Sequence, residues 1–196
     1  MDEWTIVIPV KGTSAAKSRF GPGDHSDLAL AMALDTVEAA REAALVRAVV
    51  VVTVGGPEFQ SLGARVVQDP GTGLIGAIEA GLQVAESPTG VLLGDHPGLQ
   101  PAELTSALMA AAEHPRSIVA DDEGTGSALV TALEGYRHEL EFGPDSRSRH
   151  VARGYVELDG AWPGLRRDVD RAQHLDDLAE SGLALGRRTR ALLRRR

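Results

Sequence analysis

The chain has 196 residues, of which 43% are hydrophobic, so it can bury one sizeable core and a single domain is expected. It contains no cysteine, which excludes disulfides, thiolate metal sites and thiol nucleophiles and is compatible with a reducing cytoplasm. The formal net charge of -8 argues against a nucleic-acid-binding surface. The N-terminus lacks the basic start of a signal peptide and no apolar run reaches membrane-spanning length, so we expect a cytoplasmic protein without a membrane partner.

The first two thirds of the chain alternate strand-like runs with helix-length amphipathic segments. This pattern is typical of βαβ units and a mainly parallel sheet. We expect strands at residues 5–10, 48–54, 65–68, 90–94 and 117–120. We expect helices at residues 27–45, 74–85 and 101–113.

The last third predicts shorter elements. Extended segments are expected at residues 127–133, 155–158 and 166–169, and a closing helix at residues 171–181. No repeat or break in composition marks a second domain, although residues 187–196 contain six arginines. We therefore predict a three-layer α/β/α sandwich formed by one domain at residues 1–186, followed by an arginine-rich tail at residues 187–196.

Polar residues follow several predicted strands, where ligands bind in open α/β sheets. Lys11, Lys17 and Arg19 lie in a loop of small residues after the first strand, and Asp95 and Asp168 come at the ends of two later strands. Two carboxylates from different strand ends could hold a hard divalent cation such as Mg²⁺. An aspartate after a strand also commonly caps a helix or closes a turn, and this alternative stays open.

The cationic loop is a poor match to the P-loop motif. Residues 12–18 are one residue too short and have alanine where the second glycine belongs, so a P-loop ATPase is disfavoured. The cations could still surround a triphosphate, or form a charged surface loop. Residues 142–150 leave two similar alternatives, an anion-binding loop with serine hydroxyls and two arginines, or an exposed basic helix start.

Other common kinds of site are not indicated. The six histidines are scattered, with none at i, i+2 or i, i+4 spacing, so we expect them at the surface or in supporting positions. No G-x-S-x-G motif is present, which disfavours a serine hydrolase.

With these residues identified, the chain resembles the guanylyltransferase family of deazaflavin coenzyme F-420 biosynthesis, which acts on phosphoenolpyruvate or 2-phospho-L-lactate. The resemblance runs almost end to end, and it is specific because many short motifs occur in the same order and spacing. These are Pro9-Val10-Lys11, Ala16-Lys17-Ser18-Arg19, Leu30-Ala31-Met32, Leu34-Asp35-Thr36, Gly94-Asp95, Gly124-Thr125-Gly126, Phe142-Gly143-Pro144-Asp145-Ser146, Arg149-His150 and Gly164-Leu165-Arg166-Arg167-Asp168-Val169-Asp170. The family resembles the nucleotide-diphospho-sugar transferases, which implies their α/β sandwich.

The resemblance also implies roles for individual residues. The catalytic residues would be Lys17, Asp95 and Asp168, and the two aspartates would bind Mg²⁺. The acceptor would be bound by Ser127, Gly143 and Ser146. The nucleotide would be bound by residues in two loops, namely Lys11, Lys17, Arg19 and Gly73. Of the two lysines, we favour Lys17 for the main contact with the nucleotide phosphates.

The implied reaction transfers GMP from GTP to the phospho-acid and releases pyrophosphate. The nucleophile would be a phosphate oxygen that is already anionic, so positioning and electrostatic stabilisation would carry the catalysis without a general base. The partners would be GTP and the phospho-acid, and a homo-oligomer is left open.

The chain departs from the family's usual residues at four positions. Ile75 replaces an asparagine, His96 a leucine, Gly98 an alanine and Ser127 a threonine. Two alternatives therefore stay open, a nucleotidyltransferase of the same fold with another acceptor or nucleotide, and a non-catalytic nucleotide-binding paralogue.

Overall fold

The computed structural model describes residues 3–10, 26–169, 174, 182 and 184–194. The strands are β1 (Trp4–Pro9), β2 (Val46–Thr53), β3 (Arg65–Gln68), β4 (Thr89–Leu92), β5 (Arg116–Ala120), β6 (Ser127–Ala132) and β7 (Val156–Glu157). The helices are α1 (Ser26–Glu42), α2 (Pro57–Ser61), α3 (Leu74–Leu82), α4 (Pro101–Ala111), α5 (Ser146–Ala152), α6 (Pro163–Arg166) and α8 (Arg187–Leu193). No helix in these described ranges is long and apolar enough to cross a membrane.

The strands form one sheet of seven, in the order β3-β2-β1-β4-β6-β5-β7. The strands β3, β2, β1 and β4 run parallel to one another, and β6 lies antiparallel between β4 and β5. The short β7 pairs parallel to β5. The sheet is mainly parallel, and its parallel half brings the carboxyl ends of β1, β2 and β4 to one edge, where ligands bind in such folds.

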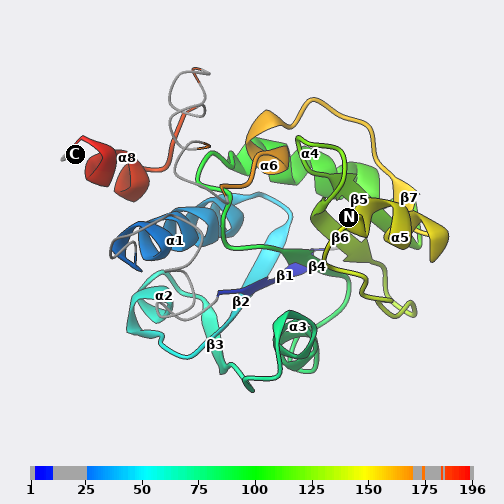
Figure 1. Ribbon diagram of the computed structural model, residues 1–196. Coiled ribbons are helices and arrows are strands. Elements are labelled where there is room, and N and C mark those ends of the chain that lie inside the picture. Colours follow the sequence, from blue (N-terminus) through cyan, green and yellow to red (C-terminus); the bar gives the residue numbers. More distant parts are fainter. Residues whose placement is uncertain (1–2, 11–25, 170–173, 175–181, 183, 195–196) are drawn as a thin grey trace.

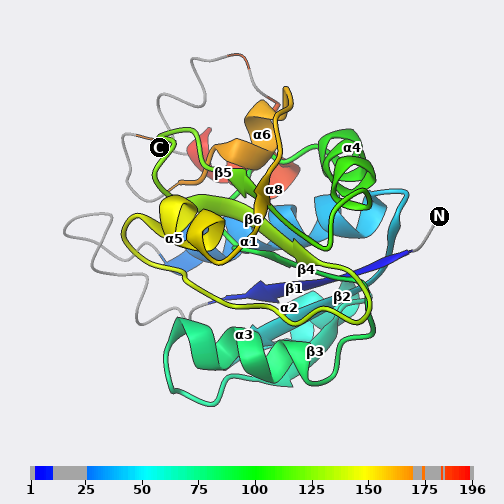
Figure 2. The same cartoon turned by 90° about the vertical axis from the view of Figure 1, so that its right-hand side faces the viewer.

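Alternation along β1 explains the layers on the two faces of the sheet. Ile6 and Ile8 belong to the apolar core that includes Val37 of α1 and Leu104 of α4, whereas Val7 packs with Ala77 of α3. Figures 1 and 2 show α3 on one side of the sheet and α1 and α4 on the other. Because both faces are covered, the middle strands β1 and β2 have apolar residues on both sides, such as Ile6 and Val7 of β1. The expected three-layer α/β/α sandwich is confirmed.

The segment that leads to Asp168 differs from the prediction. Residues 166–169 were expected to form a strand, but α6 ends at Arg166 and the three residues after it are not in a strand. The guanidinium of Arg166 donates hydrogen bonds to the carbonyl oxygens of Ala120, Leu158 and Gly160, so this side chain bridges separate segments. The strand prediction is wrong because contacts distant in sequence determine this local structure. The predicted helix at residues 171–181 lies almost entirely outside the described residues.

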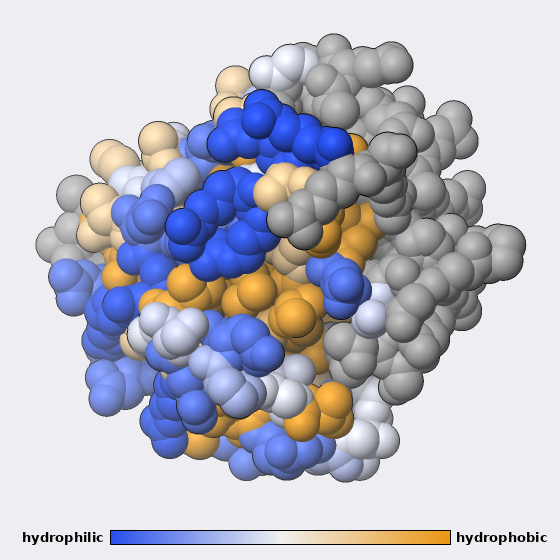
Figure 3. All heavy atoms as spheres, turned by 90° about the vertical axis from the view of Figure 1, so that its left-hand side faces the viewer, coloured by the Kyte–Doolittle hydropathy of each residue, from blue (hydrophilic) through white to orange (hydrophobic). Residues whose placement is uncertain are grey.

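The C-terminal helix α8 packs against α1. Leu192 and Leu193 of α8 pack against Leu28 and Met32 of α1. Figure 3 views the molecule from the side where α1 and α8 lie in Figure 1, and it shows hydrophobic residues at the centre of this face, bordered by hydrophilic ones. Arg187, Arg188 and Arg190 therefore lie on a helix with an apolar contact to the rest of the fold.

Candidate active site

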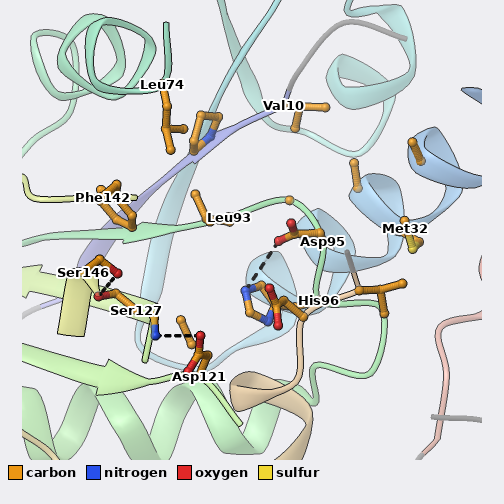
Figure 4. Close-up of a pocket in the computed structure, with 18 of the residues that line it drawn as sticks. Val10, Met32, Leu74, Leu93, Asp95, His96, Asp121, Ser127, Phe142 and Ser146 are labelled. Carbon is orange, nitrogen blue, oxygen red and sulfur yellow. Dashed lines mark hydrogen bonds and ion pairs between the residues drawn. The ribbon is translucent and has the colours of Figure 1, made fainter. Parts of the chain in front are cut away.

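A cavity of about 660 Å³ lies at the carboxyl edge of the parallel strands. Val10 lines it after β1, Thr53 at the end of β2, and Gly94 and Asp95 after β4. Apolar side chains such as Leu74 contribute a second part of the wall (Figure 4). A cavity with both apolar and polar walls at this edge is the expected place for a ligand.

The structure brings five of the predicted site residues to this one cavity. They are Asp95, Ser127, Gly143, Ser146 and Asp168. Gly73 is not among the lining residues, although its neighbour Leu74 is. The three predicted cations, Lys11, Lys17 and Arg19, lie outside the described residues.

Two carboxylates from distant parts of the chain line the cavity. Asp95 follows β4 and Asp168 follows α6, and the N–H of Val169 donates to the carbonyl oxygen of Asp95 at 2.9 Å. That hydrogen bond holds the two segments together. In the described part of the chain, no three carboxylate, histidine or cysteine side chains form a metal centre. Two carboxylates nevertheless suit Mg²⁺, which is commonly bound by one or two carboxylates and completed by water and substrate phosphates.

His96 lies buried beside these aspartates, which is the supporting position and not the surface position of the two that the sequence left open. Its Nε2 lies 3.7 Å from Oδ1 of Asp95 (Figure 4). Burial lowers the pKa of His96, and the negative charge of Asp168 opposes this shift. The backbone N–H of His96 donates to the hydroxyl of Thr36, which itself donates to the carbonyl of Met32. Thr36 thus attaches the loop after β4 to α1, a role that the sequence reasoning missed.

Two serine hydroxyls line another part of the cavity. Ser127 is the first residue of β6 and Ser146 the first of α5, and their hydroxyl oxygens lie 2.9 Å apart (Figure 4). His150, one turn further along α5, places Nδ1 3.0 Å from the Ser127 hydroxyl oxygen. This buried histidine occupies a supporting position that sequence reasoning did not single out, although its spacing of four residues from Ser146 was a usable signal.

Backbone turns hold the serines in place. The carboxylate of Asp121 accepts hydrogen bonds from the N–H groups of Thr125 and Gly126, at 2.9 and 2.8 Å, just before Ser127. Gly143 has φ +126°, a conformation that favours glycine, and its carbonyl accepts from the N–H of Ser146. Gly126 and Gly143 thus allow the backbone conformation of the two turns that position the serines.

The arginines beside Ser146 do not line the cavity. Arg147 binds Glu157 with its Nε, at 2.9 Å from one carboxylate oxygen, and Arg149 pairs with Glu141. Nearby carboxylates therefore occupy both guanidinium groups. The structure supports the basic helix start for the arginines, whereas Asp145 and Ser146 of this segment line the cavity.

The charge of the cavity wall is strongly negative. Six acidic residues line it, and they are Glu58, Asp95, Asp121, Glu123, Asp145 and Asp168. Within the described residues, the wall contains no lysine or arginine. An anionic ligand would therefore need cations from elsewhere to offset this charge.

Comparison with known proteins assigns the chain to a family. A family model described as a MobA-like NTP transferase domain matches residues 28–158. The phosphoenolpyruvate guanylyltransferase of Streptomyces scabiei is 44% identical, over 96% of this chain and 95% of its own length. This chain belongs to the phosphoenolpyruvate guanylyltransferase family. The relative of that name from Geodermatophilus obscurus is 43% identical, over 97% of this chain and 94% of its own.

Solved structures share the fold of this phosphoenolpyruvate guanylyltransferase family member at much lower identity. A predicted nucleotide-diphospho-sugar transferase from Desulfovibrio desulfuricans superposes with a TM-score of 0.68 at 17% identity, covering 100% of this chain and 95% of its own. The 2-C-methyl-D-erythritol 4-phosphate cytidylyltransferase of Thermus thermophilus gives 0.58 at 18% identity, covering 92% and 98%. The predicted family and its nucleotide-diphospho-sugar transferase-like fold are confirmed, and the chain is a nucleotidyltransferase.

Proposed function

We propose that this protein transfers GMP from GTP to phosphoenolpyruvate, or to 2-phospho-L-lactate, and releases pyrophosphate in coenzyme F-420 biosynthesis. One observation carries the proposal. The carboxylates of Asp95 and Asp168 and the hydroxyls of Ser127 and Ser146 line one cavity, which suits a metal–phosphate group at the carboxylates and an anionic acceptor at the hydroxyls. The name of the full-length relatives supports the same reaction.

The chemistry requires positioning more than proton transfer. A phosphate oxygen of the acceptor attacks the α-phosphorus of GTP, the new P–O bond forms, and the bond to the pyrophosphate oxygen breaks. The attacking oxygen is anionic at neutral pH, so no general base is required. When bound by Asp95 and Asp168, a Mg²⁺ ion supplies charge neutralisation for the phosphate oxygens.

The chain's own residues divide between the two substrates. The hydroxyls of Ser127 and Ser146 and the loop at Gly143 bind the phosphate or carboxylate oxygens of the acceptor. Lys11, Lys17, Arg19 and the turn at Gly73 bind the nucleotide, with Lys17 at the phosphates. The triphosphate of GTP needs cations, and the described cavity wall contains no lysine or arginine. The loop after β1 contains two lysines and an arginine, which supports its assignment to the nucleotide.

Pyrophosphate release tests the reaction. The purified protein is incubated with Mg²⁺ and GTP, together with either phospho-acid, and CTP and ATP replace GTP in parallel reactions. We expect pyrophosphate only with GTP and a phospho-acid acceptor. Pyrophosphate formation that does not exceed the enzyme-free blank with either acceptor would overturn the proposal.

Asp95→Asn separates the enzyme from a binding protein. Removing one carboxylate charge should lower kcat/KM by about 100-fold or more, in line with the loss of one transition-state charge contact. Glu79→Gln, at an exposed acid on α3, is the matched control and should retain activity. Equal activity of Asp95→Asn and the unmodified protein would contradict the metal role.

We propose a cytoplasmic enzyme whose nucleotidyltransferase domain comprises residues 1–186, with small-molecule substrates and no nucleic-acid partner. Sedimentation velocity tests whether it forms a homo-oligomer.

A further inference from the structure

His150 lies in a continuous chain of hydrogen bonds that ends at the cavity. The backbone N–H of Glu141 donates to Nε2 of His150 at 3.0 Å. On the other side of the ring, Nδ1 lies 3.0 Å from the hydroxyl oxygen of Ser127, which lies 2.9 Å from that of Ser146. The chain therefore connects a backbone amide to the two hydroxyls that line the acceptor side of the cavity.

The direction of the first hydrogen bond determines the tautomer of the ring. A backbone N–H can only donate, so Nε2 of His150 must be the acceptor and carries no proton. A neutral imidazole then has its proton on Nδ1, and Nδ1–H donates to the Ser127 hydroxyl oxygen. Burial lowers the pKa of His150, which favours this neutral ring.

The tautomer decides how many hydroxyl protons face a ligand. His150 donates to Ser127, and one serine hydroxyl donates to the other, so one serine O–H has no acceptor among the residues that the structure describes. It is therefore available to an oxygen in the cavity. With the proton on Nε2 instead, Ser127 would donate to Nδ1 and Ser146 to Ser127, and no hydroxyl proton would be left.

The surroundings of His150 hold this arrangement in place. The side chain is fully buried, and the rings of Phe142 and Tyr155 pack edge-on at centroid distances of 5.2 and 5.1 Å. These aromatic contacts restrict rotation of the imidazole and keep water from competing for Nδ1.

We propose that His150 is a positioning residue for acceptor binding. Its Nδ1–H tautomer keeps one hydroxyl of the Ser127–Ser146 pair available as a donor to a phosphate or carboxylate oxygen. This inference rests on the proposed function for the identity of the acceptor, whereas the tautomer is a property of the protein alone.

Nitrogen NMR of the unmodified protein, with ¹⁵N-labelled histidine, tests the tautomer directly. We expect the His150 ring to be neutral near pH 7, with the proton on Nδ1. His150→Phe identifies the signal by its loss. A proton on Nε2, or on both nitrogens, at this pH would overturn the inference whatever the activity of the protein.

Kinetics of two variants test the role in acceptor binding. His150→Phe keeps an aromatic ring but removes the donor to Ser127, and it should raise the KM for the phospho-acid about tenfold or more, as expected for losing an ordered hydrogen bond to an anion. The KM for GTP should change less than about twofold, because the lost contact lies on the acceptor side. His150→Asn keeps an N–H near the position of Nδ1 and should recover part of the loss.

A partly buried histidine, His138, provides the control. His138 binds Thr89 through Nε2 at 3.0 Å and does not line the cavity, so His138→Phe should leave the acceptor KM unchanged. Equal increases in both KM values for His150→Phe, without recovery in His150→Asn, would indicate a structural role and overturn the inference. Absence of turnover by the unmodified protein would instead overturn the proposed function, while the NMR result would still decide the tautomer.

Discussion

Gly126 and Asp121 shape the turn that precedes Ser127. A Cβ atom added at Gly126 would overlap the carboxylate of Asp121, which accepts two backbone N–H groups in this turn. At this position, glycine is required because of close packing. A single side chain thus controls where β6 begins and where the Ser127 hydroxyl lies.

Replacing this glycine should destabilise the turn. We expect Gly126→Ala to lower the free energy of unfolding by about 1–3 kcal/mol, since Asp121 must move and its hydrogen bonds are weakened. Gly55→Ala is the control, because nothing lies within 4 Å of an added Cβ there, and it should change stability by less than about 0.5 kcal/mol. Urea unfolding measures both variants, and equal values for the two would contradict the packing argument.

At the scale of elements, α1 anchors the C-terminal helix through a buried carboxylate. Asp35 accepts hydrogen bonds from the backbone N–H groups of Arg188 and Thr189, at 3.2 and 2.8 Å. The guanidinium of Arg188 also lies 3.3 Å from Asp35 and 2.8 Å from Glu38. A carboxylate at a helix N-terminus satisfies unpaired N–H groups and interacts favourably with the helix dipole. The arginine-rich segment is thereby attached to the helix that also lines the cavity.

Two neighbouring arginines should differ in their effect on stability. Arg188→Ala leaves Asp35, whose side chain is 1% exposed, with its backbone donors alone, and should cost about 1–3 kcal/mol of unfolding free energy. Arg187 pairs with Glu38 but its side chain is 67% exposed, so Arg187→Ala should cost less than about 1 kcal/mol. Chemical denaturation of both variants compares them. A larger loss for Arg187→Ala would show that the buried carboxylate is not the anchor.

Several elements were predictable from local pattern, and others were not. The apolar runs of β1 and β2 and the proline at the start of α4 indicated those elements directly. The short helix α2 was not predicted, and α6 was assigned in part to a strand. Gly164 in α6 explains the difficulty, because its N–H donates to Glu103 and an added Cβ would meet the backbone of Gly98. Packing partners far away in the sequence determine such a segment.

For the whole molecule, buried neutral histidines predict sensitivity to acid. Burial lowers the pKa of His138 from 6.5 to about 4. The folded state therefore takes up this proton at lower pH than the unfolded state. The neutral ring of His138 thus contributes fully to the free energy of unfolding above pH 6.5, and this contribution is lost as the pH falls towards 4.

Stability measured against pH tests this property. The free energy of unfolding should decrease between pH 6.5 and 4, and His138 should account for about 3 kcal/mol of the decrease at most. His138→Gln removes the titrating ring and should flatten the profile. An unchanged profile in His138→Gln would refute the assignment.

The sequence by itself determined the class of fold, several of the loops that line the cavity, and the family. These depend on the local periodicity of apolar residues, on turn-forming residues and on the order of short motifs, all of which can be read along the chain. Only the tertiary structure decided that Asp95 and Asp168 line one cavity and that Arg147 and Arg149 bind local carboxylates. It also decided that His150 contacts Ser127 and that Asp35 binds the start of α8. Each of these contacts forms because helices and strands pack against one another and the loops between them close. The local pattern of residue types along the chain does not show which distant groups this packing brings together.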